Sequence, residues 1–122
     1  MKDYIDIRKN GCFYNVYGDD CYILFYLFKY KINSNKVGFH NRWINSVINK
    51  LNYYKINYYI NNNRVCFGKI NNYYKYIELG KNKYIEYNKL IDIENKILKL
   101  DNDKLKDIYN ILKDYVWIMN LN

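Results

Sequence analysis

The sequence contains no proline, alanine, glutamine or threonine, and its only histidine is His40. Its most apolar stretch, residues 22–30, is much shorter than the roughly 18 apolar residues that a membrane-spanning helix needs. The first residues also lack the apolar segment of a secretory signal peptide. We therefore expect a cytoplasmic protein that does not insert into a membrane.

Cysteine is too scarce for a disulfide framework. The three cysteines, Cys12, Cys21 and Cys66, are an odd number and include no Cys-x-x-Cys pair. A structural zinc site needs four ligands at characteristic spacings, and these spacings fit none of the known patterns. We expect reduced, mostly buried thiols, no metal site and no cofactor.

Catalytic motifs are also missing. Ser34 and Ser46 are the only serines, no nucleophile motif surrounds His40, and no glycine-rich phosphate loop is present. Asp19 and Asp20 are the only carboxylate pair in the first part of the chain, but adjacent side chains on a turn normally point apart. We expect one of them to cap the following helix instead of acting in acid–base catalysis. The sequence therefore predicts a protein that is not an enzyme.

The abundant residues are Asn, Lys, Ile and Tyr, whose codons are rich in A and T, so the source is expected to be an AT-rich bacterium, phage or mobile element. The net charge of +8 is unevenly distributed. Residues 1–70 contain 11 Lys and Arg against 4 Asp and Glu, whereas residues 71–122 contain 9 against 8. A basic region of this kind suggests a polyanionic partner, usually nucleic acid. AT-rich coding alone could also add lysine, although it does not explain the balanced second region.

Hydropathy patterns predict an α/β fold with a mixed sheet of about six strands, in the order ββαββαββ, flanked by helices and followed by a helical segment. The expected strands are Ile5–Ile7, Cys12–Tyr17, Tyr30–Asn33, Lys36–Phe39, Ile56–Ile60 and Arg64–Lys69. The expected helices are Cys21–Lys29, Asn41–Tyr54, Tyr73–Leu79, Lys83–Leu100 and Asn102 to about Trp117. Residues 1–122 are expected to form a single domain, in which a helical extension, 71–122, packs on an α/β core, 1–70.

Several local signals support this assignment. The Asn10-Gly11 pair favours a hairpin turn, and Asp101 is a good N-cap for the last helix. Gly80 is either a break or a tolerated residue within one longer helix. The central helix has an apolar stripe formed by Trp43, Ile44, Val47, Ile48 and Leu51.

The second predicted strand carries the main candidate for binding. Alternate side chains of a strand share a face, so Phe13, Asn15 and Tyr17 point the same way. An aromatic ring can stack on or wedge between bases, and an amide can hydrogen-bond a base edge. A half-buried strand with no such role would have the same pattern. The basic residues that complete the predicted nucleic-acid-binding set are Arg8, Lys9, Lys36 and Arg42.

A likeness to a known family begins in the same strand. The segment Gly11-Cys12-Phe13-Tyr14-Asn15-Val16-Tyr17-Gly18-Asp19-Asp20-Cys21 resembles the N-terminal mismatch-recognition domain of MutS DNA-repair proteins. The family pattern is Gly-Asp-Phe-Tyr-Glu-(Val/Leu/Met)-(Phe/Tyr), followed by an acidic pair, alanine and a helix. Further matches follow in the same order at Val37-Gly38-Phe39-His40, Lys50-Leu51 and Ile56–Ile60. The resemblance covers residues 9–60, about half of the chain.

The resemblance implies a fold like that of the MutS N-terminal domain. It also implies that Phe13 occupies the position of a ring that wedges beside a base from the minor groove. Asn15 stands where the family has a glutamate that hydrogen-bonds the base, and Cys12 replaces the family's aspartate. An amide can donate and accept hydrogen bonds but carries no charge, so we expect DNA binding without mismatch sensing. The clamp, lever and ATPase domains of MutS have no counterpart in this sequence.

A second hypothesis is a small protein-binding inhibitor or adaptor, of the anti-defence or anti-CRISPR type, that acts on a host nucleic-acid enzyme. The aromatic residues of the C-terminal helices, among them Trp117, would then supply the contact surface. Simple core packing would equally explain Trp117. A homodimer formed through the last two helices is a third possibility.

Overall fold

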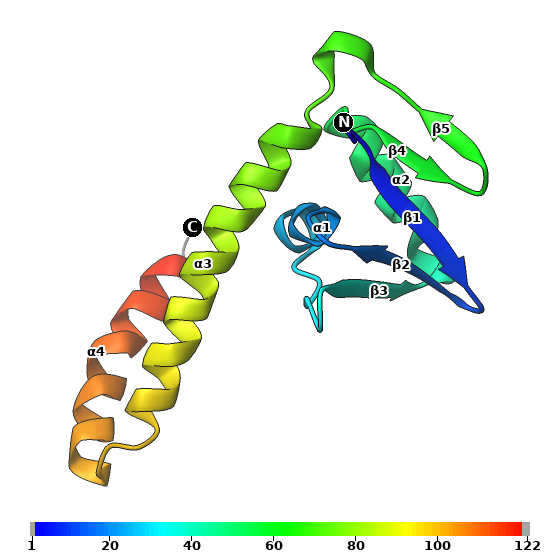
Figure 1. Ribbon diagram of the computed structural model, residues 1–122. Helices are drawn as coiled ribbons and strands as arrows, with labels where there is room; N and C mark the ends of the chain where they lie inside the picture. Colours follow the sequence, from blue (N-terminus) through cyan, green and yellow to red (C-terminus); the bar gives the residue numbers. More distant parts are fainter. Residues whose placement is uncertain (1, 121–122) are drawn as a thin grey trace. The chain divides into compact units, whose positions relative to one another are not determined.

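Five strands form one mixed sheet in the order β3-β2-β1-β4-β5 (Figure 1). The structure, a computed structural model, describes residues 2–120, and for residues 115–120 it describes the backbone alone. β1 pairs antiparallel with β2 and in parallel with β4, while β2–β3 and β4–β5 are antiparallel. The sheet confirms the predicted α/β class. The strands are β1 (Ile5–Asn10), β2 (Phe13–Tyr17), β3 (Lys36–His40), β4 (Tyr58–Ile60) and β5 (Asn63–Val65).

The helices are α1 (Asp20–Phe28), α2 (Ile44–Tyr53), α3 (Tyr73–Ile97) and α4 (Asn102–Asn120). The chain divides into two compact units, Met1–Ile85 and Glu86–Asn122, and the division falls within α3. The first unit contains 14 Lys and Arg against 5 Asp and Glu, whereas the second contains 6 Lys against 7 Asp and Glu. The basic excess therefore belongs to the unit that contains the sheet.

The hydrophobic core lies against one face of the sheet. In β3, β4 and the first half of β1, buried residues alternate with more exposed ones, because successive side chains of a strand point to opposite faces. β2 departs from this pattern, since Tyr14, Asn15 and Val16 are all buried. Side chains of α1, α2 and the start of α3 close the core over this face. Its fully or nearly fully buried members are Ile5, Ile7, Tyr14, Val16, Cys21, Ile23, Leu24, Val37, Phe39, Val47, Leu51, Ile56, Tyr58, Ile60, Tyr73 and Ile77.

Two of the local predictions in this unit are confirmed. Gly11 adopts a positive φ of 61° in the turn that joins β1 to β2, a conformation that glycine adopts without strain. In α2, Val47 and Leu51 are buried and the neighbouring stripe residues are half-buried. Trp43 is the exception, since it lies in a short 3-10 turn before α2 and stays 49% exposed.

The predicted strand at Tyr30–Asn33 is wrong, which reduces the sheet from six expected strands to five. Within the described residues this segment makes a single bridge, from Asn33 to Lys36. The Tyr30 ring instead stacks on Phe28 and Phe39, at centroid distances of 5.1 and 5.8 Å. Its β-favouring residues therefore cover the edge of the core from an irregular segment and do not extend the sheet.

Gly80 lies inside one continuous helix, which resolves the choice left open by the sequence. The residue is buried, and a Cβ atom at this position would overlap the carbonyl oxygen of Tyr22 in α1. The Tyr84 ring, one turn later, packs edge-on against Tyr22 and Phe25. Glycine is therefore required here because the backbones of α1 and α3 approach closely.

The second unit consists of the rest of α3 and α4. Asp101 caps α4, as predicted, by accepting a hydrogen bond from the backbone N–H of Lys104 at 3.0 Å. Many of its apolar side chains are exposed, among them Leu90, Ile93, Leu98, Tyr109, Ile111 and Leu112. The side chain of Trp117 lies outside the described residues. No helix in the described part of the chain combines the length and apolar character needed to cross a membrane.

Candidate nucleic-acid interface

The face of the sheet opposite the core is polar and aromatic, and we call it the open face. Its members follow from the strand registers, because residues paired across neighbouring strands share a face. β2 runs through the middle of this surface, with β3 on one side and β1 on the other. The open face consists of Asp6, Arg8 and Asn10 of β1, Phe13, Asn15 and Tyr17 of β2, Lys36, Gly38 and His40 of β3, Tyr59 of β4 and Arg64 of β5.

The structure brings the three predicted β2 residues to this face. Phe13 and Tyr17 are 50% and 45% exposed, respectively, whereas Asn15 between them is only 6% exposed. The two rings therefore stand on either side of a recessed amide. This arrangement agrees with the alternation expected from the sequence, although the burial of Asn15 was not foreseen.

Asn15 is recessed because its neighbour in β3 is a glycine. A Cβ atom built on Gly38 would lie only 2.7 Å from the Asn15 Oδ1. The amide therefore occupies the space that a side chain at position 38 would fill. No hydrogen bond within the described residues involves the Asn15 side chain. Because no fully buried side-chain nitrogen or oxygen there lacks a partner, the amide atoms remain in contact with solvent. An amide offers two donor hydrogens and an acceptor oxygen. Asn15 thus presents unused hydrogen-bonding groups at the base of the open face.

Phe13 has a fixed neighbour in His40, which is not among the predicted binding residues. The two residues pair across β2 and β3, and their rings meet edge-on at a centroid distance of 5.5 Å. The His40 Nδ1 accepts a hydrogen bond from the backbone N–H of Arg42 at 3.1 Å, which orients the imidazole. In the sequence, the feature that could have indicated this contact with Phe13 is the place of His40 at the end of the segment Val37–His40, which resembles the MutS family.

Two of the four predicted basic residues lie on the open face. Arg8 pairs with Asn15 across the strands, and its guanidinium forms an ion pair of 2.9 Å with Asp6. Lys36 pairs with Tyr17 and is exposed. Both side chains can therefore reach a ligand that lies along β2.

The other two basic residues are not placed there. Lys9 pairs with Tyr14, whose side chain enters the core, so Lys9 belongs to the opposite face of β1. The guanidinium of Arg42 lies 5.4 Å from the centre of the Trp43 ring. Trp43 in turn lines a depression with residues of α1 and α2 and the segment after α1, away from the open face. Lys9 and Arg42 therefore stay predicted contacts that the structure places outside the open face.

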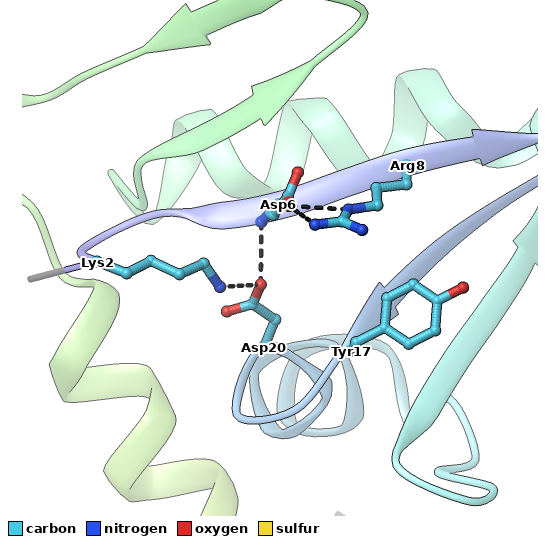
Figure 2. A pocket seen from close by; sticks show the side chains of 5 residues that line it. All are labelled: Lys2, Asp6, Arg8, Tyr17 and Asp20. Carbon is cyan, nitrogen blue, oxygen red and sulfur yellow. Dashed lines mark hydrogen bonds and ion pairs between the residues drawn. The ribbon is translucent and has the colours of Figure 1, made fainter.

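A pocket of about 250 Å³ adjoins the Tyr17 end of the open face and is lined by Lys2, Asp6, Arg8, Tyr17 and Asp20 (Figure 2). Two cations and two carboxylates line it, so their formal charges cancel. The carboxylates are already engaged, since Asp6 pairs with Arg8 and Asp20 with Lys2. The pocket therefore extends the open face without adding to its positive charge.

Asp20 does not cap α1, contrary to the expectation that Asp19 or Asp20 would do so. The N-cap position is Asp19, but its side chain makes no capping hydrogen bond. Asp20 is 1% exposed and accepts hydrogen bonds from the Lys2 ammonium at 2.5 Å, the Tyr73 hydroxyl at 2.5 Å and the Asp6 backbone N–H at 2.9 Å. It thus joins the start of the chain, β1, α1 and α3. Hydrogen-bond partners this distant in sequence give no local signal.

The surroundings of Asp20 affect two neighbouring groups. Burial raises the pKa of the Tyr73 hydroxyl, and the hydrogen bond to Asp20 adds to the rise. Burial also raises the pKa of the Cys21 thiol to about 11, and the charge of Asp20 contributes. Both groups therefore stay protonated at neutral pH.

Exposure differs among the three cysteines, which are all free. Cys21 is buried as expected, but Cys12 and Cys66 are exposed, so the expectation of mostly buried thiols was wrong. Cys12 lies in the turn before β2 and Cys66 follows the short strand β5, where neither side chain has a core to enter. Among the residues that the structure describes, no three His, Cys, Asp or Glu side chains lie together in a way that could hold a metal ion.

This difference predicts the outcome of thiol labelling with an aromatic disulfide reagent at about pH 8. Cys12 and Cys66 should react rapidly, and Cys21 should react roughly 100-fold more slowly, because it is buried and its raised pKa lowers the thiolate fraction. In denaturant all three should react at once. Three rapid thiols in the native protein would contradict the packing of α1 on the sheet.

Comparisons with known proteins add no relative. No protein-family model, curated protein or solved structure matched the chain.

Proposed function

We propose that the chain is a non-catalytic DNA-binding module that contacts DNA through the open face. The observation that carries this proposal is the unpaired Asn15 amide, recessed between the exposed rings of Phe13 and Tyr17. Exposed rings can stack on bases of any sequence, and an amide can hydrogen-bond a base edge. The resemblance of residues 9–60 to the MutS recognition domain supports the same strand, since Phe13 and Asn15 match its DNA-contacting positions.

Charge supports the proposal independently of the motif. The unit that contains the open face has 14 basic and 5 acidic side chains, a net charge of +9. Arg8, Lys36 and Arg64 lie on the face itself, although Arg8 and Arg64 also pair with aspartates. A positive surface attracts the phosphate backbone and releases its counterions on binding. With two or three phosphates contacted, the affinity should fall roughly 10- to 40-fold between about 50 and 200 mM salt.

Fluorescence polarisation with labelled DNA tests the proposal. The wild-type protein should bind at micromolar concentrations in low salt, and Phe13→Ala should weaken binding by about tenfold through the loss of one stacking contact. Tyr53→Ala is the matched control, because this ring is 76% exposed but belongs to α2. The proposal fails if matched duplex, mismatched duplex and single-stranded DNA all remain unbound, or if both variants lose affinity equally.

A second candidate function is favoured by the second unit. Leu90, Leu98 and Tyr109 are each 66–67% exposed there, and several exposed apolar side chains on one small unit mark a surface for protein contact. A protein-binding inhibitor or adaptor would use this surface. Affinity purification from host cells should then recover one specific protein with wild type and with Phe13→Ala, and should lose it with Leu98→Lys. Recovery that depends on Phe13 would count against this second function.

A further inference from the structure

We propose that the open face binds single-stranded DNA, with one base on each of the Phe13 and Tyr17 rings and the edge of an intervening base at Asn15. This inference rests on the proposed function and specifies its substrate. It depends on the width of the sheet, the spacing of the two rings and the unpaired amide.

The width of the sheet disfavours an intact duplex. Phe13 has Asn10 of β1 on one side and His40 of β3 on the other. Neighbouring strands are about 4.8 Å apart, so the three strands β1, β2 and β3 form a surface roughly 10 Å wide around the Phe13 ring. The minor groove of B-form DNA is only about 6 Å wide, and the major groove of about 12 Å is narrower than a five-stranded sheet. The face therefore suits bases that leave the helix and lie on it.

The spacing of the rings points the same way. Phe13 and Tyr17 are four residues apart in one strand, a distance of about 13 Å along the backbone, and Asn15 lies midway. Bases stacked in a duplex are about 3.4 Å apart, so consecutive bases cannot each meet one of these side chains. An unstacked single strand can spread its bases to match this spacing. The two rings are half exposed, which leaves surface for a base to stack on.

Asn15 and the flanking cations complete the site. The amide is recessed and makes no hydrogen bond within the described residues, so it is available to the edge of a base that lies between the rings. Arg8 pairs with Asn15 on one side of β2, and Lys36 pairs with Tyr17 on the other. A phosphate backbone that runs along either side of β2 would meet one of them. In a duplex the Watson–Crick edge of such a base would already be paired, whereas in a single strand it is free.

The experiment compares four fluorescent ligands by polarisation with the full chain: oligo-dT of eight nucleotides, an abasic strand of the same length, a 12-base-pair duplex and oligo-U of eight nucleotides. Oligo-dT should bind about tenfold more tightly than the abasic strand or the duplex, since each stacked base contributes strongly. Phe13→Ala and Tyr17→Ala should each weaken oligo-dT binding by about tenfold, Phe13→Trp should retain it, and Tyr53→Ala should leave it unchanged.

The outcomes separate this inference from the proposed function. A duplex that binds as tightly as oligo-dT overturns the single-strand inference but leaves the DNA-binding function intact. Equal affinity for oligo-dT and the abasic strand overturns the stacking arrangement. A preference for oligo-U would support single-strand binding and overturn the choice of DNA. Failure of every ligand to bind overturns both proposals.

Discussion

Replacing Asp20 with alanine should lower the free energy of unfolding by about 2–4 kcal/mol. The change leaves two donors, the Tyr73 hydroxyl and the Asp6 backbone N–H, without a hydrogen-bond acceptor. The Tyr73 side chain is 3% exposed, so its hydroxyl depends on this buried acceptor. The Lys2 ammonium is 42% exposed and can return to solvent, so it adds less to the loss. Urea unfolding followed by circular dichroism measures the change.

Asp19→Ala is the matched control for this variant. Asp19 is adjacent in sequence and 60% exposed, and it forms a loose ion pair of 3.7 Å with Lys81. Its loss should change the stability by less than about 0.5 kcal/mol. Combining Asp20→Ala with Tyr73→Phe removes the hydroxyl that has lost its acceptor. The double variant should therefore lose less free energy of unfolding than the sum of the two single losses. Equal stability of the two aspartate variants would exclude the buried hydrogen-bond arrangement.

Replacing Gly80 with alanine should destabilise the protein by about 1–3 kcal/mol, although the same change in an exposed helix stabilises it by nearly 1 kcal/mol. The reversal of sign has a steric cause. The new Cβ atom would overlap the Tyr22 carbonyl oxygen and lie 2.7 Å from its carbonyl carbon, and backbone atoms of α1 cannot move aside as a side chain can.

Asn82→Ala reports the helix-propensity effect alone, since Asn82 is an exposed residue of the same helix. It should leave the stability unchanged or raise it slightly. Thermal or urea unfolding of both variants gives the comparison. A Gly80→Ala protein as stable as Asn82→Ala would mean that α3 does not pack closely on α1.

The sequence predicted those features that depend on neighbouring residues. The Asn10-Gly11 turn, the apolar stripe of α2 and the Asp101 cap each follow from local chemistry, and each is confirmed. The shared direction of the three β2 side chains also follows from alternation. The same rule, applied to β1 from Ile5 and Ile7, would have placed Lys9 on the core side.

Features decided by distant contacts could not be predicted in this way. Tyr30 has a high β propensity, but its ring stacks on Phe39, so the segment covers the core and makes no strand. Asp20 has the composition of a helix cap, yet partners 14, 18 and 53 residues away bury it. Asn15 is recessed because Gly38, 23 positions later, pairs with it. In each case tertiary contacts override a sound local preference.

The two exposed thiols make the molecule bifunctional towards oxidation. Cys12 lies at the turn between β1 and β2, whereas Cys66 follows β5 near the level of the start of β1. The length of β1 separates them by about 20 Å, well beyond the reach of an internal disulfide. Air oxidation of a concentrated sample should therefore link molecules end to end into open chains that do not stop at a dimer. On a denaturing gel without reducing agent these chains should appear as a ladder of bands. Adding a reducing agent should convert the ladder to the single band of the monomer.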